Sequence, residues 1–292
     1  AGTVKVTAYV AETDDYGYAY DAKTFTVTKA PTSVTLAGTS VVYTGLGQAV
    51  TASVADSGGA ALTVVVDIAY TDASGTTVAS PTVAGDYTVT ATVNDTKYGG
   101  STTDTLTILK APLTITADDQ AKEYLQANPT LTLTYTGFQN SEDSSVLSTQ
   151  ATVGTGADAS SSLGEYGIVV YGAAAANYAI THVDGTLTVE KNTVVITLTG
   201  TSVTYTGSAF AVTATPSVAG VSVVVTYADA ASAAVASPTN AGTYTVTATV
   251  DSTLYQATQT GTLTIAKATA TVTLSDLTAT YNGSAKLAAA TT

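Results

Sequence analysis

The sequence predicts an all-β fold: tandem immunoglobulin-like β-sandwich modules arranged as an elongated rod. Two observations predict it. First, the chain repeats itself, because residues 78–95 (VASPTVAGDYTVTATVND) return as residues 235–252 (VASPTNAGTYTVTATVDS). Second, short stretches of alternating Val and Thr are separated by turns rich in Gly, Pro, Asn and Asp, as in a sandwich of many short strands. A segment duplicated around a different one indicates a row of folding units rather than one enzyme domain.

The composition favours strands over helices. The chain has 292 residues, of which 45% are hydrophobic. Its abundant Val and Thr are β-branched and suit a half-buried pleated surface. No stretch follows the 3.6-residue period of an amphipathic helix. The chain contains no Cys, so disulfide bonds cannot support the small cores.

The charge of the chain and the length of its apolar runs argue against two kinds of partner. The formal net charge is −13, and all 9 basic residues are Lys. A chain this acidic and without Arg is poorly suited to a phosphate backbone, so we expect no nucleic acid partner. No apolar run reaches the length of a membrane span, so we expect no membrane insertion within this segment.

Lysines at nearly regular intervals mark the ends of the modules. Each closes an alternating strand, and they are Lys29, Lys110, Lys191 and Lys267. The first two intervals between them are equal and the third is slightly shorter. We therefore expect complete modules at residues 31–111, 112–191 and 192–268, of which the first and third share one type and the middle one is a second type. Residues 1–30 align with the last strands of the first type and residues 269–292 with its first strands, so both are interpreted as parts of truncated modules.

Seven strands are expected within residues 192–268, with turns where Gly, Ser, Asn and Pro collect. Their expected ranges are 193–199, 202–205, 210–215, 221–227, 233–236, 242–250 and 260–266. About seven short strands in a module of this size are typical of an immunoglobulin-like sandwich. Because the links between modules are short and some contain Pro, they favour a semi-rigid arrangement.

Recurring tyrosines are the expected structural core residues. A Gly-x-Tyr element occurs in each complete module, and a second Tyr follows it at an almost constant interval. The pairs are Tyr87 and Tyr98, Tyr166 and Tyr178, and Tyr244 and Tyr255. We interpret them as paired core residues, one of which bonds the backbone through its hydroxyl, as in a tyrosine corner. The alternative is an exposed platform on which carbohydrate stacks.

We expect no catalytic site and no enzyme activity. His182 is the only histidine and there is no Cys, so a multi-histidine metal site is excluded. We expect His182 to lie in a surface turn. No Ser lies in a Gly-x-Ser-x-Gly elbow. Adjacent acidic residues on a strand, such as Asp118 and Asp119, point to opposite faces and do not converge on one bond.

Two structural devices remain open. Asp118 and Asp119 lie just after the first strand of a module, where they and nearby loop carbonyls could bind Ca²⁺ and stiffen a junction. No other cofactor is expected. The second device is a covalent cross-link between Lys and Asn beside a buried acid, which would lower the mass of the intact protein by one ammonia per bond. The recurrent Lys ends a strand at a junction, where an exposed role is more natural.

The middle module carries four motifs in a fixed order. They are Ala127-Asn-Pro-Thr-Leu-Thr132, Tyr135-x-Gly137-Phe138, Gly164-x-Tyr166-x-Ile168 and Asn177-Tyr178-x-Ile180. With them, residues 113–191 closely resemble the MBG modules (named from mucin-binding glycoproteins) of bacterial cell-surface adhesins. The flanking modules are similar to a sister MBG type through VTYTG, ASPT-x-AG-x-YTVTATV and TLTIAKA. Two departures, Leu125 in place of Gly and Ser141-Glu142-Asp143 in place of a Gly-Asp turn, predict altered loop shapes.

The resemblance implies a secreted, repetitive protein on the bacterial cell surface, and three functional classes follow. The first is a non-catalytic stalk that projects a distal adhesive domain and whose partners are neighbouring modules of the same array. The second is an adhesion module that binds mucin glycans of host or neighbouring cells. The third is a subunit of a self-associating extracellular fibre, joined through sheet edges or through the partial ends of neighbouring chains. Repetition, acidity and the lack of a pocket motif favour the stalk.

Overall fold

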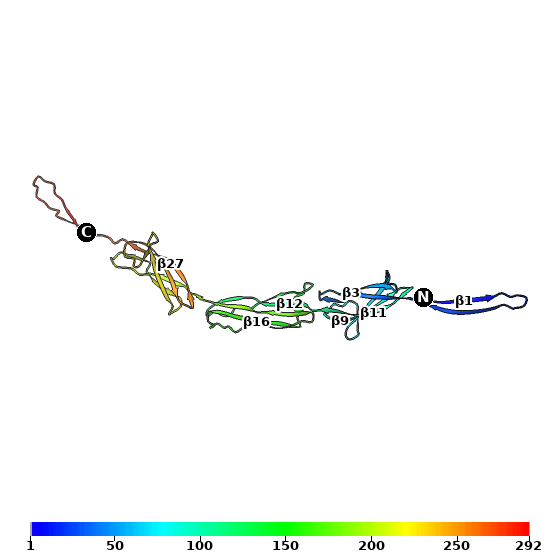
Figure 1. The fold of residues 1–292 in the computed structure, drawn as a ribbon. Coiled ribbons are helices and arrows are strands. Elements are labelled where there is room, and N and C mark those ends of the chain that lie inside the picture. The colour runs from blue at the N-terminus through cyan, green and yellow to red at the C-terminus, as the bar shows by residue number, and fades with distance from the viewer. Residues whose placement is uncertain (1, 292) are drawn as a thin grey trace. The chain divides into compact units, whose positions relative to one another are not determined.

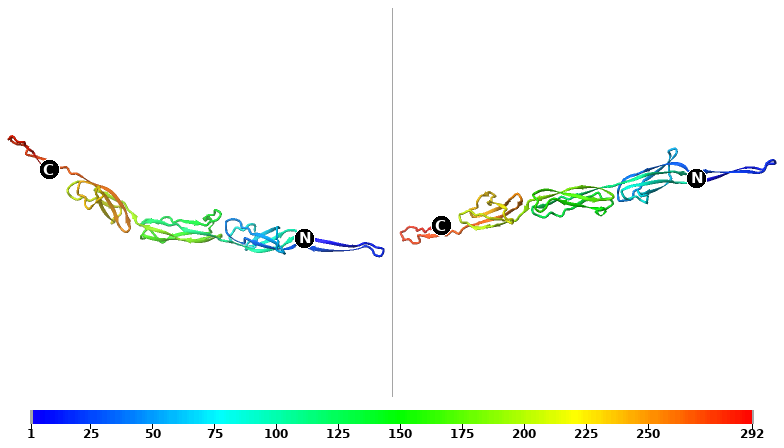
Figure 2. Two further views of the ribbon diagram at one scale, coloured as in Figure 1. Left: turned by 45° about the horizontal axis from the view of Figure 1, so that its top comes forward. Right: turned by 90° about the horizontal axis from the view of Figure 1, so that it is seen from below.

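The computed structural model describes residues 2–291 and consists almost entirely of β-strands (Figure 1). The prediction of an all-β fold made of tandem β-sandwich modules is confirmed. Within the described range, the helical content is a single 3-10 turn, η1 (Ser144–Val146). Figure 2 gives two further views of the same strands.

The chain forms two compact units. The first unit contains Ala1–Asp118, Leu131–Thr155 and Gly167–Gly185. The second unit contains Asp119–Thr130, Gly156–Tyr166 and Thr186–Thr292. The middle module therefore contributes strands to both units.

The first unit opens with a two-stranded hairpin and continues into a complete sandwich. The hairpin pairs β1 (Gly2–Val10) with β2 (Ala19–Val27). One sheet of the sandwich has the order β10 (Tyr98–Gly99), β3 (Ala30–Ala37), β5 (Thr51–Asp56) and β6 (Ala61–Leu62). The other has the order β4 (Ser40–Val42), β11 (Ser101–Leu109), β9 (Gly85–Asn94), β7 (Val65–Thr71) and β8 (Thr77–Val78).

Alternation of apolar and polar residues places the core of this sandwich. Along β9, Val89 and Ala91 are fully buried while the intervening Thr residues face outward, as the period of two requires. The neighbouring strand of the same sheet, β11, contributes Leu106 and Ile108 to the same core. Each fully buried Leu or Ile adds about 1.5–3 kcal/mol of stability. The apolar core is therefore the main support of a module without disulfide bonds.

The middle module supplies five further strands to the first unit. Three form a sheet in the order β14 (Leu133–Thr136), β12 (Ala111–Ala117) and β17 (Tyr178–Val183). The other two, β15 (Thr149–Thr155) and β16 (Gly164–Ala174), pair antiparallel. Every second residue of β12 is buried, from Ala111 to Ala117, and Leu113 and Ile115 are fully inaccessible. This strand is the core strand of the middle module within the unit.

The second unit contains the last complete sandwich. Its five-stranded sheet has the order β21 (Ser202–Thr204), β27 (Thr258–Ala266), β25 (Gly242–Asp251), β23 (Ser222–Ala228) and β24 (Ala234–Val235). The smaller pairs are β20 (Ile196–Thr199) with β22 (Thr213–Pro216), β19 (Asn192–Thr193) with β26 (Tyr255–Gln256), β13 (Gln120–Glu123) with β18 (Gly185–Glu190), and β28 (Thr273–Ser275) with β29 (Ala289–Thr291). The five-stranded sheet repeats the strand order of β4, β11, β9, β7 and β8, so the duplicated sequence has a duplicated topology.

Candidate functional site: contacts at the module junctions

A hydrogen-bonded cluster of polar side chains in the first unit joins residues 31–111 to the middle module. The rings of Tyr43 and Tyr178 meet edge to face, with centroids 5.5 Å apart and an interplanar angle of 78°. Tyr43 follows β4 and Tyr178 begins β17, so the two strand ends position the rings. The side chains are 5% and 2% exposed, respectively. A buried edge-to-face pair stabilises by about 0.5–1.5 kcal/mol beyond its area.

Glu142 links the two tyrosines through both oxygens of its carboxylate. The hydroxyl of Tyr43 donates to Oε1 over 2.6 Å, and the hydroxyl of Tyr178 donates to Oε2. The Tyr178 oxygen accepts in turn from the backbone N–H of Gln139 over 2.9 Å. Burial and then the bond to Glu142 raise the pKa of Tyr178 to about 12, and the same causes raise the pKa of Tyr43. Both hydroxyls are therefore neutral donors at physiological pH.

An unusual turn carries Glu142 to this position. Asn140 and Ser141 precede it with φ angles of 49° and 59°, in the left-handed region that non-glycine residues rarely adopt. The N–H of Glu142 closes the turn on the carbonyl of Gln139 over 2.9 Å. After it, Asp143 caps η1 by accepting from Ser145 N–H, and its bonds to Ser145 lower the pKa of Asp143. The altered loop expected at Ser141-Glu142-Asp143 is thus the segment that carries the shared carboxylate.

Backbone and lysine bonds complete the first junction. The N–H of Ala111 donates to Asn177 O over 2.9 Å, and the N–H of Ala84 donates to Asn177 Oδ1 over 3.0 Å. The ammonium of Lys110 donates to the carbonyl of Ala175 over 3.2 Å. The turn before β17 is therefore held by three donors from residues 31–111.

The second unit contains a junction of the same design. Tyr124 and Tyr255 meet edge to face, with centroids 6.1 Å apart and an interplanar angle of 77°. The ammonium of Lys191 donates to Ser252 O over 2.9 Å. The N–H of Asn192 donates to Leu254 O over 2.9 Å, and its side-chain amide donates to Tyr124 O over 2.7 Å.

We call the shared set of bonds the junction contact. It consists of an edge-to-face Tyr pair, a Lys bonded to the carbonyl three residues before the second Tyr, and the N–H after that Lys bonded to the carbonyl directly before the Tyr. Part of it recurs where residues 1–30 meet the first sandwich, because Ala30 N–H donates to Lys97 O over 2.8 Å. There the carbon chain of Lys29 lies against Gly99, where a Cβ would lie 3.2 Å from it.

Three of the predicted tyrosines bond the backbone four residues upstream. The acceptors of Tyr87, Tyr166 and Tyr244 are the carbonyls of Val83, Ser162 and Asn240, over 3.0, 2.9 and 2.9 Å. The remaining three, Tyr98, Tyr178 and Tyr255, begin the short strands at the junctions. Tyr178 is buried, and Tyr98 and Tyr255 are half-buried.

The partners of the junction tyrosines were not predicted from the sequence. Tyr43 precedes Lys110 by the same interval as Tyr124 precedes Lys191, and Tyr205 precedes Lys267 by a slightly shorter one. This recurring Tyr is the sequence signal that could have identified the partners, and in two of the modules it stands in the motif Val-x-Tyr-Thr-Gly. Glu142 had no comparable signal, because it occurs in one module and lies 99 positions from Tyr43.

The two aspartates considered for Ca²⁺ bond the protein itself. Asp118 accepts from the hydroxyls of Thr132 and Thr134 over 2.6 and 2.7 Å, and these bonds lower its pKa. Asp119 accepts from Thr186 N–H over 2.7 Å. Residues 2–291 contain no group of three or more His, Cys, Asp or Glu side chains arranged to hold a metal ion. Calcium binding at this pair remains a prediction.

Lys122 is buried, and its ammonium donates to the carbonyls of Gln126, over 3.1 Å, and Asp158. His182 is exposed on β17, opposite Ile115 of β12. In the part of the chain that the structure describes, no helix is long and apolar enough to cross a membrane.

Models of two related domain families match the chain along most of its length. The MBG domain model matches residues 32–112, 194–269 and 270–292. The model of the MBG domain of YGX type matches residues 113–188. The resemblance inferred from the motifs is therefore confirmed. These families are not enzyme families, and MBG domains occur in surface-associated proteins. No curated protein matches the chain.

Proposed function

We propose that this chain, which belongs to the MBG domain family, is a non-catalytic spacer that holds a distal adhesive domain away from a bacterial cell. Repeats of this family imply an adhesin-like repeat region. The repeated junction contact carries this proposal. A spacer needs each module to restrict the orientation of the next, whereas an independent binding module does not.

The bonds of the junction contact are sufficient to restrict bending. An edge-to-face Tyr pair contributes about 0.5–1.5 kcal/mol, and each hydrogen bond about 0.5–1.5 kcal/mol. With three or more such interactions at a junction, the closed arrangement is favoured by about 2–4 kcal/mol. An equilibrium of this size leaves the junction open only a few per cent of the time or less.

Composition supports an extracellular place for this spacer. The net charge of −13 makes neighbouring copies repel each other, which keeps crowded surface proteins soluble and apart. The absence of Cys makes the fold independent of the redox state of its surroundings. Both properties suit a stalk that is presented in many copies outside the cell.

Small-angle X-ray scattering of the full chain tests the spacer proposal. We expect the scattering of the wild type to fit restrained modules, and the double variant Tyr43→Ala/Tyr124→Ala to fit flexibly linked ones. Tyr171→Ala is the matched control, because Tyr171 is 53% exposed and lies outside both junction contacts. Wild-type scattering already typical of freely jointed modules would refute the proposal.

An exposed tyrosine cluster favours glycan binding as a second candidate. Tyr9, Tyr18 and Tyr20 of the first hairpin are 57–67% exposed, with ring centroids 6.0–6.4 Å apart. Aligning Gly2 with Gly85 places Tyr9 at the position of Thr92, which is exposed on β9. These rings thus occupy the solvent face of the sheet, where a sugar ring can stack.

A glycan array probed with the full chain tests this candidate. Binding that is lost in Tyr9→Ser/Tyr20→Ser and kept in Tyr171→Ser would support a glycan site on the hairpin. An array without signal for the wild type would refute it and leave the spacer proposal untouched.

A further inference from the structure

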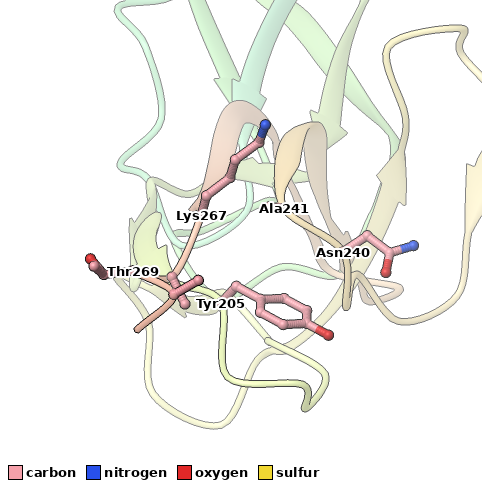
Figure 3. A pocket seen from close by; sticks show the side chains of 7 residues that line it. Tyr205, Asn240, Ala241, Lys267 and Thr269 are labelled. Atoms are coloured by element: carbon pink, nitrogen blue, oxygen red, sulfur yellow. The ribbon is translucent and has the colours of Figure 1, made fainter. Parts of the chain in front are cut away.

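The second unit contains an open pocket of about 500 Å³ at the end of its sandwich. Tyr205, Asn240, Ala241, Lys267 and Ala268 line it, together with residues 269–270. The ring of Tyr205 lies between Asn240 and Thr269 (Figure 3). Its walls come from the residue after β21, the turn before β25 and the residues after β27.

The pocket repeats the donor side of the first junction. Tyr205 follows β21 as Tyr43 follows β4, and the N–H of each Tyr bonds the parallel partner strand over 2.8 Å. Ala241 stands in SPTNAG where Ala84 stands in SPTVAG. Lys267 and Ala268 follow β27 as Lys110 and Ala111 follow β11. All four donor positions of the first junction therefore recur around one pocket.

In the first unit these four positions bond two loops of the middle module, the turn at Glu142 and the turn at residues 175–177. Tyr43 donates to Glu142, Ala84 and Ala111 donate to Asn177, and Lys110 donates to Ala175. Four donors on one module thus meet four acceptor oxygens on the next. Tyr205, Ala241, Lys267 and Ala268 present the same four kinds of donor, two backbone N–H groups, a phenol and an ammonium.

Exposure shows that this second donor set is uncovered. Tyr205 is 40% exposed, whereas Tyr43 is 5% exposed. Ala268 is exposed, whereas Ala111 is fully buried. The contrast lies between matching positions of the same module type, so it reflects the presence or absence of a covering segment and not the sequence of the module itself.

We propose that the pocket is a docking site, within one polypeptide, for the Tyr-bearing turn of a further MBG module, seated as the Asn177–Tyr178 turn is seated on Tyr43. The occupant presents a tyrosine ring edge to Tyr205 and backbone carbonyls to Lys267 and Ala268. Residues 270–292, which match the MBG domain model, leave the pocket directly after these donors. The proposal concerns which partner the surface accepts and does not depend on the chain acting as a spacer.

Amide hydrogen exchange on an extended chain tests the proposal. A second copy of residues 112–191 is inserted between Ala268 and Thr269, so that it follows Lys267-Ala268 as the original follows Lys110-Ala111. We expect the amides of Ala268 and Ala241 to exchange roughly five- to tenfold more slowly than in the unextended chain, as a new hydrogen bond predicts. Ala111 and Ala84 are the internal standards for the occupied state.

A Tyr205→Ala variant of the extended chain is the control. Tyr205 is substantially exposed, so its truncation leaves the sandwich folded, and we expect the added protection at Ala268 to be lost while that at Ala111 stays. Unchanged exchange at Ala268 and Ala241 on insertion would overturn the proposal.

Two other outcomes would also overturn it. Protection at Ala268 that rises with the concentration of the unextended chain would assign the pocket to a second copy. Protection induced by a glycan in the unextended chain would assign it to a carbohydrate.

Scattering that shows flexible junctions, together with a docked insert, would refute the spacer role alone.

Discussion

Replacing Glu142 with Ala removes the shared acceptor of the first junction. In the wild type, its carboxylate accepts the hydroxyls of Tyr43 and Tyr178. A hydrogen bond to a charged group contributes about 1.5–3 kcal/mol, and both tyrosines are too deeply buried to turn freely to water. Because Glu142 itself is half-buried, water replaces part of the loss. We expect the junction to be destabilised by about 2–4 kcal/mol.

Amide exchange of Gln139 and Ala84 measures this loss locally. Gln139 donates to the Tyr178 oxygen and Ala84 donates to Asn177 Oδ1, so both report opening of the junction. The expected free-energy change corresponds to exchange that is roughly 30- to 900-fold faster. Glu142→Gln keeps one carbonyl acceptor and should give an intermediate value.

Glu165→Ala is the matched control, because Glu165 is an exposed carboxylate on β16 and surface substitutions change stability by about 0.5 kcal/mol or less. A second readout is the titration of tyrosine absorbance, in which loss of the carboxylate should move the pKa of Tyr178 down from about 12. Exchange in Glu142→Ala within twofold of the control would refute the assignment of Glu142 as the link between the modules.

Three further predictions follow from the same structure. The pKa of Tyr178 is raised to about 12 from an ordinary 10.0, so the folded state favours the neutral hydroxyl. The stability that this hydroxyl contributes is therefore complete below pH 10 and is lost as pH rises towards 12. Urea unfolding across that range should show a steeper loss for the wild type than for Tyr178→Phe, and parallel profiles would contradict this. Gly137→Ala should destabilise by at least about 1–3 kcal/mol, because φ is 117° and the new Cβ would lie 2.3 Å from Pro112 O. Gly167→Ala, with open space around it, is the thermal-melting control, and equal melting points would count against the strain. Finally, Tyr244→Phe should lower the free energy of unfolding by about 0.5–1.5 kcal/mol, because it removes the hydrogen bond to the carbonyl four residues upstream. Urea unfolding measures this loss, and an unchanged midpoint would show that water can replace the bond.

Local pattern was enough to predict the long strands of the last sandwich. The strand expected at residues 193–199 is instead divided into β19 and β20, and β26 was not predicted. Alternation of Val and Thr placed one strand at residues 242–250, and the structure has β25 at Gly242–Asp251. It placed another at residues 260–266, and β27 spans Thr258–Ala266. Such strands bury every second side chain, so the sequence itself records which face is inside.

The junction partners could not be predicted in the same way. Tyr43 and Glu142 lie in separate loops far apart in the sequence, and no periodicity connects them. The turn that brings Glu142 into place depends on left-handed backbone at Asn140 and Ser141, which residue type alone does not disclose. The same holds for Leu125, with a φ of 66° beside Tyr124. Backbone conformations of this kind leave no periodic pattern of residue types in the sequence.

The separation of donors and acceptors on each module also bears on how such a gene changes length. Donors after the final strand of one module meet acceptors on a turn of the next module, so each module carries both a donor side and an acceptor side. An in-frame gain or loss of one whole repeat, from one junction lysine to the next, therefore keeps a junction lysine next to a Tyr-bearing turn at each new boundary.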